Sequence, residues 1–352
     1  MTSTWNFPGE GGGISGADKD AVILSICAGQ YGGIKTLPNG TVAIHQNTQP
    51  ASVLRQGGPT IALLVGSSLW GVLWWPLRHF NAAGLRGAWL ILVVYLLLAI
   101  PAGLWSWHRR HELRQHGRTL VGLLLLGGWT NVAFMLALVH GEVIRILLLF
   151  YLSPVWAIFA ARIFLQEAIG WRGGLAALLA VSGSALVVSN GQGFSLADLD
   201  TNDLLAISSG LAFALSNVIL RADTVLGDVH RATAVWWGCV LIALPFAFFQ
   251  YLPALPLPEY GYLLAFSWLW IAGATVVVQF GVARMPVSVS AVIMPFEVIV
   301  GALSAWWLAG EAPTLLELFG GILILLAALL QITRSQGHPI LLGGVEMEKG
   351  EL

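Results

Sequence analysis

The hydrophobic positions of this chain are grouped in long runs that begin near residue 60 and end near residue 333. The hydrocarbon core of a bilayer is about 30 Å thick and is crossed by about 20 apolar residues of helix, and the runs reach that length. Segments such as 120–126 and 322–330 do not alternate between apolar and polar residues, which argues against membrane-spanning β-strands. Because lipid offers the backbone no hydrogen bonds, each run is expected to be helical.

This pattern predicts an all-α membrane protein of about ten transmembrane helices joined by short links. The expected spans are 61–78, 88–107, 119–139, 143–163, 171–189, 203–220, 232–252, 262–282, 287–308 and 315–333. Residues 1–58 are instead rich in Gly, Ser, Thr, Asn and Gln, which predicts a polar and largely disordered N-terminal tail. Residues 334–352 are expected to form a C-terminal tail in the cytoplasm.

The composition favours a lipid environment over water or nucleic acid. Of the 352 residues, 57% are hydrophobic and 10% are charged, whereas soluble domains carry about 25% charged residues. The formal net charge of −1 gives no indication of a nucleic-acid partner. The two cysteines, Cys27 and Cys239, match no metal or redox spacing. We therefore expect the lipid bilayer as a partner and assign no cofactor and no metal site.

The arginines predict the orientation, because cytoplasmic links are enriched in Lys and Arg. The links after spans 2, 4, 6 and 8 and the span ends beside them hold nine arginines, whereas the opposite set of links holds two. The arginine-rich side is therefore expected to face the cytoplasm, with both termini on that side. No room remains between the spans for a soluble domain, so we expect a multi-pass protein of the cell (inner, cytoplasmic) membrane.

A weak internal repeat relates the two halves of the membrane region. A shift of 144 residues lays the fourth and fifth spans over the ninth and tenth, so that Ser153 falls on Glu297 and Glu167 falls on Glu311. Each half has five spans, and because five is odd, the second half must enter the membrane from the opposite side. Two inverted halves are the arrangement that lets a transporter alternate around a site near the membrane midplane.

Short motifs follow one another in a fixed order along the same region. Trp70-Gly71 lies in the first span, Leu149–Pro154 in the fourth and Phe296–Val298 in the ninth, with Gly310-Glu311 after it. In this order they resemble the EamA-type branch of the drug/metabolite transporter superfamily. The resemblance implies ten helices in two inverted five-helix repeats.

The resemblance covers both halves of the membrane region, with one departure. The first EamA-like repeat corresponds to residues 61–189 and the second to residues 203–333. The second repeat of such proteins often has Glu-Pro where this chain has Glu297-Val298, and here a proline lies at Pro295 instead. We therefore expect the local bend of the ninth span three residues earlier than in the family.

Glu297 is an ionisable residue expected near the middle of the ninth span. A carboxylate in the bilayer costs free energy unless it is protonated or paired, and such residues commonly serve function. One interpretation is proton coupling, in which Glu297 binds and releases a proton during transport and contacts the substrate. The other is a protonated side chain that bonds a neighbouring helix.

Arg145 lies about one turn inside the fourth span, near its expected extracellular end. Its guanidinium could hold a substrate carboxylate through two parallel hydrogen bonds. Alternatively, the side chain extends to the lipid head groups beside Glu142. If Arg145 and Glu297 both face one cavity, a zwitterion such as an amino acid becomes an attractive substrate.

Aromatic and amide side chains at span depth complete the candidate substrate site. Aromatic faces suit apolar or cationic substrates, although most of the sixteen tryptophans are expected at the membrane interface or in packing. Trp70 and Trp74 are four residues apart and are expected to share one helix face. Buried amides are costly when unpaired, and bonding between helices is their alternative role. The remaining candidates are Tyr151, Asn217 and Gln279.

Together these features predict a secondary transporter, with export as the expected direction and protons as a candidate coupling ion. The substrate would be a small metabolite, either amino-acid-like or another small organic solute. The chain has no P-loop motif, so ATP is not its expected energy source. An intramembrane enzyme is one alternative, but the eight histidines lie in links, span ends or tails and we assign no catalytic residue. A non-transporting membrane receptor or scaffold is another.

Overall fold

The computed structural model describes residues 34–36, 42–44, 57–164, 171–189, 199–222, 225–250, 254–285, 290 and 293–332. The chain divides into two units, of which the smaller comprises residues 1–55 and 337–352. In this unit, strands β1 (Ile34–Thr36) and β2 (Val42–Ile44) pair antiparallel. Six residues of the predicted disordered tail therefore form a hairpin. Nearly all the rest of that tail, and the predicted C-terminal tail, lie outside the described residues.

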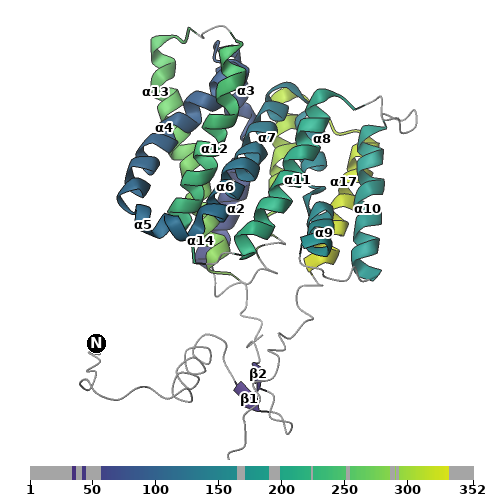
Figure 1. The fold of residues 1–352 in the computed structure, drawn as a ribbon. Helices are drawn as coiled ribbons and strands as arrows, with labels where there is room; N and C mark the ends of the chain where they lie inside the picture. Colours follow the sequence, from purple (N-terminus) through teal and green to yellow (C-terminus); the bar gives the residue numbers. More distant parts are fainter. Residues whose placement is uncertain are drawn as a thin grey trace, which may run out of the picture. The chain divides into compact units, whose positions relative to one another are not determined.

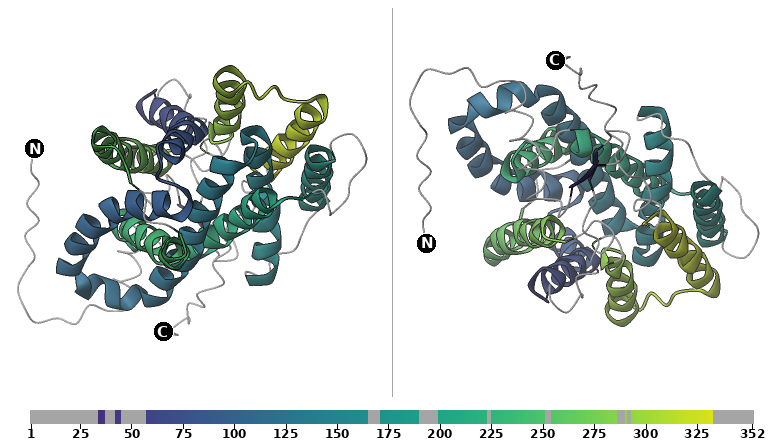
Figure 2. Two further views of the ribbon diagram at one scale, coloured as in Figure 1. Left: turned by 90° about the horizontal axis from the view of Figure 1, so that it is seen from above. Right: turned by 90° about the horizontal axis from the view of Figure 1, so that it is seen from below.

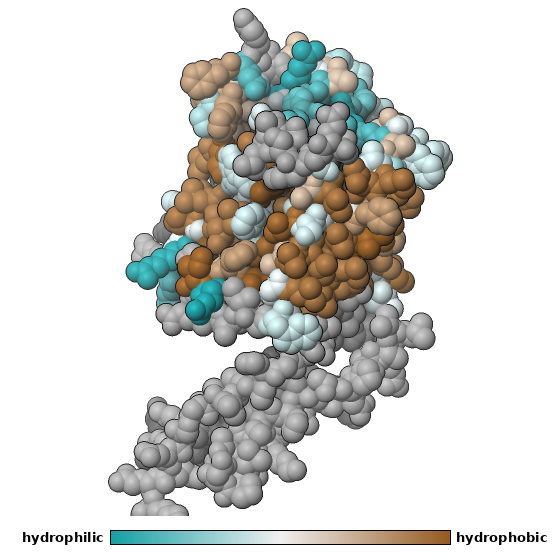
Figure 3. Space-filling model, turned by 90° about the vertical axis from the view of Figure 1, so that its right-hand side faces the viewer, coloured by the Kyte–Doolittle hydropathy of each residue, from teal (hydrophilic) through white to brown (hydrophobic). Residues whose placement is uncertain are grey.

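The larger unit, residues 56–336, is helical throughout its described part (Figure 1). Its hydrophobic surface forms a broad band, and hydrophilic residues gather at its upper end (Figure 3). Such a band is what a bilayer requires, and the predicted all-α membrane fold is confirmed.

The helices, in chain order, are α2 (Gly57–Gly71), α3 (Trp74–Ala82), α4 (Gly87–His108), α5 (Arg110–Leu113), η2 (Arg114–His116), α6 (Gly117–Gly122), η3 (Leu123–Gly127), α7 (Gly128–His140), α8 (Val143–Phe150), α9 (Ser153–Phe164), α10 (Trp171–Val188), α11 (Thr201–Ala222), α12 (Asp228–Phe248), α13 (Leu257–Ala265), η5 (Phe266–Ala272), α14 (Gly273–Ala283), α16 (Phe296–Ser304), η6 (Ala305–Ala309) and α17 (Leu315–Ile332).

Seven helical stretches of the described residues are long and apolar enough to cross a membrane. They occupy the predicted positions of spans 1 to 4 and 6 to 8. The fifth, ninth and tenth positions hold shorter apolar helices, Gly173–Val188, Phe296–Ala309 and Leu315–Leu330. The membrane region is thus multi-pass, and full-length spans are found at seven of the ten predicted positions.

The two halves of the membrane region share their irregularities. Pro101 inside α4 and Pro245 inside α12 are 144 residues apart. The π-helical turns η3 and η5 begin 143 residues apart, in the third and eighth spans. The fourth span is interrupted at Tyr151–Leu152 and the ninth at Met294–Pro295. The predicted bend before Glu297 is therefore present, and the internal repeat of the sequence is also found in the structure.

The helices also pair as two inverted repeats require. Helix α4 packs against α12, α8 against α16 and α10 against α17, which joins spans 2 and 7, 4 and 9, and 5 and 10. The contact of α7 with α11 has its counterpart in the contact of α14 with α2. Views along the bundle show α10 and α17 side by side at one edge (Figure 2). Each contact is thus the one expected when corresponding spans of the two five-helix units are exchanged.

Helix α8 is surrounded by protein on nearly all sides. Seven of its eight residues are buried, and Arg145 is the eighth. A helix that is hydrophobic all round belongs in a core, and α8 contacts α7, α10, α11, α16 and α17. The break that follows α8 is consequently held inside the protein, away from lipid.

Glycines allow a close approach of helices at the α10–α17 contact. A Cβ added at Gly183 would lie 2.5 Å from the carbonyl oxygen of Gly320, and a Cβ at Gly320 would lie 2.5 Å from that of Gly183. Close packing through small residues therefore holds for this pair. It does not hold for Gly174, where an added Cβ meets nothing within 4 Å.

We predict that Gly183→Ala lowers the melting temperature of the detergent-solubilised protein, because the new methyl group forces α10 away from α17. Overpacking of this kind costs about 1–3 kcal/mol. Gly174→Ala in the same helix is the matched control and should be neutral or slightly stabilising, since alanine favours helix by about 0.5–1 kcal/mol over glycine. Equal melting temperatures for the two variants would contradict the packing shown here.

Candidate functional site

Three interrupted helices meet around Glu297. The first span is interrupted at Val72–Leu73, the fourth at Tyr151–Leu152 and the ninth at Met294–Pro295. A Cβ added at Gly71 would lie 2.5 Å from the carbonyl oxygen of Glu297, so the end of α2 lies directly against the start of α16. Broken helices that meet at membrane depth are the usual setting of transporter binding sites.

Prolines explain where these helices restart. Pro76 and Pro154 lie in the first turns of α3 and α9, and Pro295 directly precedes α16. Proline lacks a backbone N–H and fits the first turn of a helix, but it cannot continue a helix from the preceding turn without losing a hydrogen bond. The local sequence therefore stops each span at the level where the three breaks converge.

Glu297 lies in the first turn of α16 with its side chain buried at 7% exposure. The Tyr151 hydroxyl lies 3.3 Å from Oε2 of Glu297 and 3.0 Å from the carbonyl oxygen of Met294. The break of the fourth span thus contacts the break of the ninth. Two predicted site residues, Tyr151 and Glu297, are brought together although they are 146 residues apart.

Trp74 ties the first repeat to the second. Its indole N–H donates to the Ser304 hydroxyl at 3.0 Å, and the Arg78 guanidinium lies 5.1 Å from its ring centroid. Trp70, at the end of α2, is partly buried against the core. The prediction that Trp70 and Trp74 share a helix face assumed a continuous helix, and the break at Val72–Leu73 removes that basis.

The Arg145 guanidinium is engaged with Asp203 on α11. Its Nε donates to Oδ1 at 2.7 Å and its Nη2 donates to Oδ2 at 2.5 Å, with both side chains largely buried. Asp203 also accepts the backbone N–H of Asp200 at 3.1 Å, and Asp200 accepts that of Asp203 at 2.7 Å. Asp203 was missed by sequence reasoning, although the spacing of two acids at a helix start is typical of a helix cap.

A second ion pair joins the repeats at the end of the bundle predicted to be extracellular. Arg78 donates to Oε1 of Glu311 at 2.7 Å and to the carbonyl oxygen of Gly141 at 2.6 Å. Oε2 of Glu311 accepts the backbone N–H of Val143 at 2.8 Å, at the start of α8. One carboxylate of the second repeat therefore holds two elements of the first. Glu167, its predicted counterpart, lies outside the described residues.

Glu142, beside this pair, faces other acids. It lines a cavity of about 250 Å³ together with Glu311 and Glu317. Partial burial, with the nearby Glu317 carboxylate adding to it, raises the pKa of Glu142, while Arg145 acts in the opposite direction. The folded protein therefore binds a proton at Glu142 more tightly than the unfolded chain does.

The two candidate amides lie on separate helices of the second repeat. Asn217 is partly buried on α11 and Gln279 is partly buried on α14. Their participation in a substrate site stays a prediction, as does that of Trp70.

Comparison with known proteins gives one consistent result. The model of the EamA-like transporter family matches residues 59–189 and again residues 201–333. An uncharacterized transporter of Archaeoglobus fulgidus is 25% identical over 281 residues, which cover 76% of this chain and 94% of the relative. A solved crystal structure is similar with a TM-score of 0.52 at 18% identity, over 80% of this chain and 99% of the other. That likeness concerns the fold.

Replacing both residues of the Arg145–Asp203 pair should distinguish a structural role of Arg145 from a role in substrate binding. We predict that Asp203→Asn destabilises the protein by about 3–5 kcal/mol, because it removes the counter-charge of a largely buried guanidinium. The double variant Arg145→Met, Asp203→Leu should recover most of that loss in a thermal melt. If it also retains transport, Arg145 does not hold the substrate; if it folds and fails to transport, Arg145 does.

For Glu142 we predict a stability difference that depends on pH. Because its folded pKa is raised, the charged form is penalised in the fold, and this penalty grows as pH rises through the folded pKa. Glu142→Gln should therefore raise the melting temperature slightly at neutral pH, with the gain disappearing on acidification. The effect should be small, since the side chain is exposed and screened. A gain that persists unchanged in acid would contradict this assignment.

Proposed function

The chain belongs to the EamA-like transporter family, and from that premise we propose that it exports a small metabolite across the cytoplasmic membrane by alternating access, with Glu297 carrying a proton. Membrane transport follows from the family, whose model matches both halves of the membrane region. The observation that carries the finer proposal is the contact of Tyr151 with Glu297 at the meeting point of three helix breaks.

The hydrogen bonds around Tyr151 support a proton-binding role for Glu297. A tyrosine hydroxyl has one proton and so donates to one acceptor at a time. When Tyr151 donates to the Met294 carbonyl, a protonated Glu297 can donate to the tyrosine oxygen; when Glu297 is ionised, the tyrosine can turn and donate to it. Each protonation state of Glu297 therefore has its own hydrogen-bond arrangement, and only a small rotation separates the two.

The contacts at the predicted extracellular end support alternating access. The Arg78–Glu311 pair and the Trp74–Ser304 hydrogen bond both join the first repeat to the second. Rocking of one repeat against the other would have to break them to open that end. In this proposal they stabilise the conformation closed to the outside.

The substrate class we propose is a small amino-acid-like or other organic solute. A zwitterion could place its ammonium group beside Glu297 and its carboxylate near Arg145, where it would compete with Asp203 for the guanidinium. Trp70, Asn217 and Gln279 remain candidates for contacts to the rest of such a molecule.

An intramembrane enzyme and a non-transporting receptor are the alternatives to transport of this kind. Counterflow in proteoliposomes distinguishes them, using a panel of radiolabelled L-amino acids and small carboxylic acids. Transport predicts that unlabelled solute inside drives uptake of the same labelled solute, whereas catalysis predicts chemical conversion of the label. Export predicts in addition that overexpression lowers the cellular content of the solute identified.

We predict that Glu297→Gln abolishes uptake driven by a proton gradient while the protein keeps its melting temperature. Glutamine resembles the protonated carboxyl group but cannot release a proton, so counterflow, which needs no net proton movement, should survive. Asp228→Asn, which removes one exposed carboxylate in the first turn of α12, serves as the control and should leave both activities intact. Undiminished proton-driven uptake by the Glu297→Gln variant would remove Glu297 from the mechanism.

A further inference from the structure

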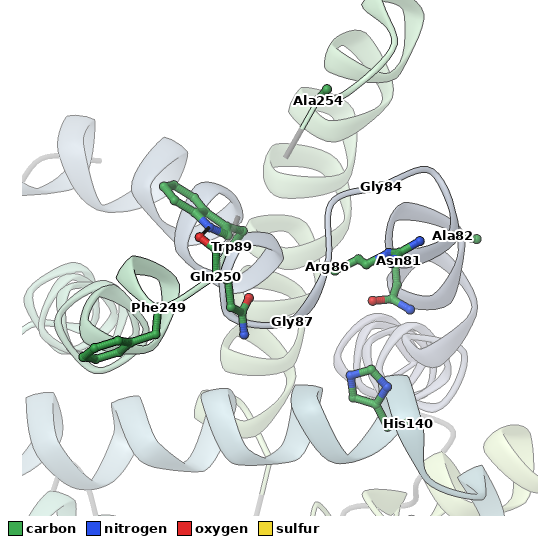
Figure 4. Close-up of a pocket in the computed structure, with 10 residues that line it drawn as sticks. All are labelled: Asn81, Ala82, Gly84, Arg86, Gly87, Trp89, His140, Phe249, Gln250 and Ala254. Carbon is green, nitrogen blue, oxygen red and sulfur yellow. Dashed lines mark hydrogen bonds between the residues drawn. The ribbon is translucent and has the colours of Figure 1, made fainter. Parts of the chain in front are cut away.

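A second, larger cavity of about 870 Å³ lies at the end of the bundle predicted to be extracellular, away from Glu297. Its walls come from the α3–α4 link, the end of α7 and the α12–α13 link, and so from both repeats (Figure 4). Pockets of about 300–1,000 Å³ are typical of small-molecule sites. The cavity is therefore large enough for a small organic ligand.

Glycines at the junction of α3 and α4 line this cavity. Gly84 and Gly87 have φ angles of 111° and 54°, a backbone region that other residues rarely adopt. A Cβ added at Gly87 would lie 2.9 Å from Nε2 of Gln250, so the side chain from the α12–α13 link rests directly on the glycine. The Trp89 indole N–H approaches the Gln250 carbonyl oxygen at 3.5 Å and joins the start of α4 to the α12–α13 link.

The charge of the lining indicates an anion. Among the described residues that line the cavity, Arg86 and His140 can be positively charged and there is no Asp or Glu. Both residues are exposed, so solutes can reach them. Guanidinium binds carboxylate and phosphate groups with two parallel hydrogen bonds.

An unsatisfied amide adds a second, independent indication of a ligand. Oδ1 of Asn81 is buried and makes no hydrogen bond within the described residues. A buried polar atom without a partner costs free energy, and a rotation of the Asn81 side chain that brought Oδ1 to an N–H or O–H group of a ligand in the cavity would remove that cost. Asn81 lies with Arg86 and His140 on one side of the cavity, whereas Trp89 and Phe249 lie on the other (Figure 4).

We propose that this cavity is a binding site for a small organic anion, with its carboxylate or phosphate group at Arg86 and His140 and its apolar part against Trp89 and Phe249. The site is distinct from the one around Glu297 and does not depend on the transport mechanism. The anionic group could belong to a free solute or to the head group of an anionic phospholipid.

Binding of phenyl phosphate and of benzoate to the full-length protein in a neutral detergent, measured by calorimetry, tests the proposal. Both anions should bind, and the uncharged analogue benzamide should bind at least about tenfold more weakly. Arg86→Gln should weaken binding of the anions by at least about tenfold, because it removes the charge-assisted hydrogen bonds. Arg162→Gln, at an exposed arginine of α9, is the matched control and should bind like the unaltered protein.

Two nanodisc compositions identify the source of the anion. If the natural ligand is a lipid head group, adding phosphatidylglycerol to phosphatidylcholine discs should reduce phenyl phosphate binding, and native mass spectrometry should find the lipid on the unaltered protein but not on Arg86→Gln. If it is a free solute, the two compositions should bind phenyl phosphate equally. Equal affinity of Arg86→Gln and the unaltered protein, with both melting at the same temperature, would overturn the proposal, as would the failure of both anions to bind.

Discussion

The structure depends on one constraint, which is that lipid cannot hydrogen-bond to the peptide backbone. Continuous helix satisfies the backbone within each span, and irregular backbone at membrane depth is tolerated only where protein surrounds it. The three helix breaks obey this rule by meeting one another. The break after α8 is enclosed by other helices, and the carbonyl of Met294, at the break before α16, is within hydrogen-bond distance of Tyr151.

The same constraint places a carboxyl group inside the protein. A helix that restarts inside the protein presents its first turn to the interior, and Glu297 lies in such a turn. The partial positive charge at a helix N-terminus favours a carboxylate there. This position is the basis of the proton-binding role proposed for Glu297.

The two repeats are joined by contacts of different kinds. Along α10 and α17 the contact is steric, because Gly183 and Gly320 bring backbone against backbone. At the end predicted to be extracellular it is polar, through Arg78 and Glu311. The Arg78–Glu311 pair is only partly buried, so water can replace its partners, whereas backbone packed against backbone at the glycines cannot separate without leaving a gap. In the proposed transport cycle the steric contact would serve as a fixed axis and the polar contact as a gate, and the proposed anion site lies at that same polar end.

Local sequence determined the parts of this protein that depend on single segments. Apolar runs determined the spans, Pro295 determined the bend before Glu297, and the order of motifs indicated the two inverted halves. Tertiary structure alone decided the partners: Asp203 for Arg145, Tyr151 for Glu297 and Glu311 for Arg78. A run of hydrophobic residues specifies that a helix enters the membrane, but in lipid each of its faces is equally soluble. Which face meets which neighbour is decided by the packing of helices far apart in the chain.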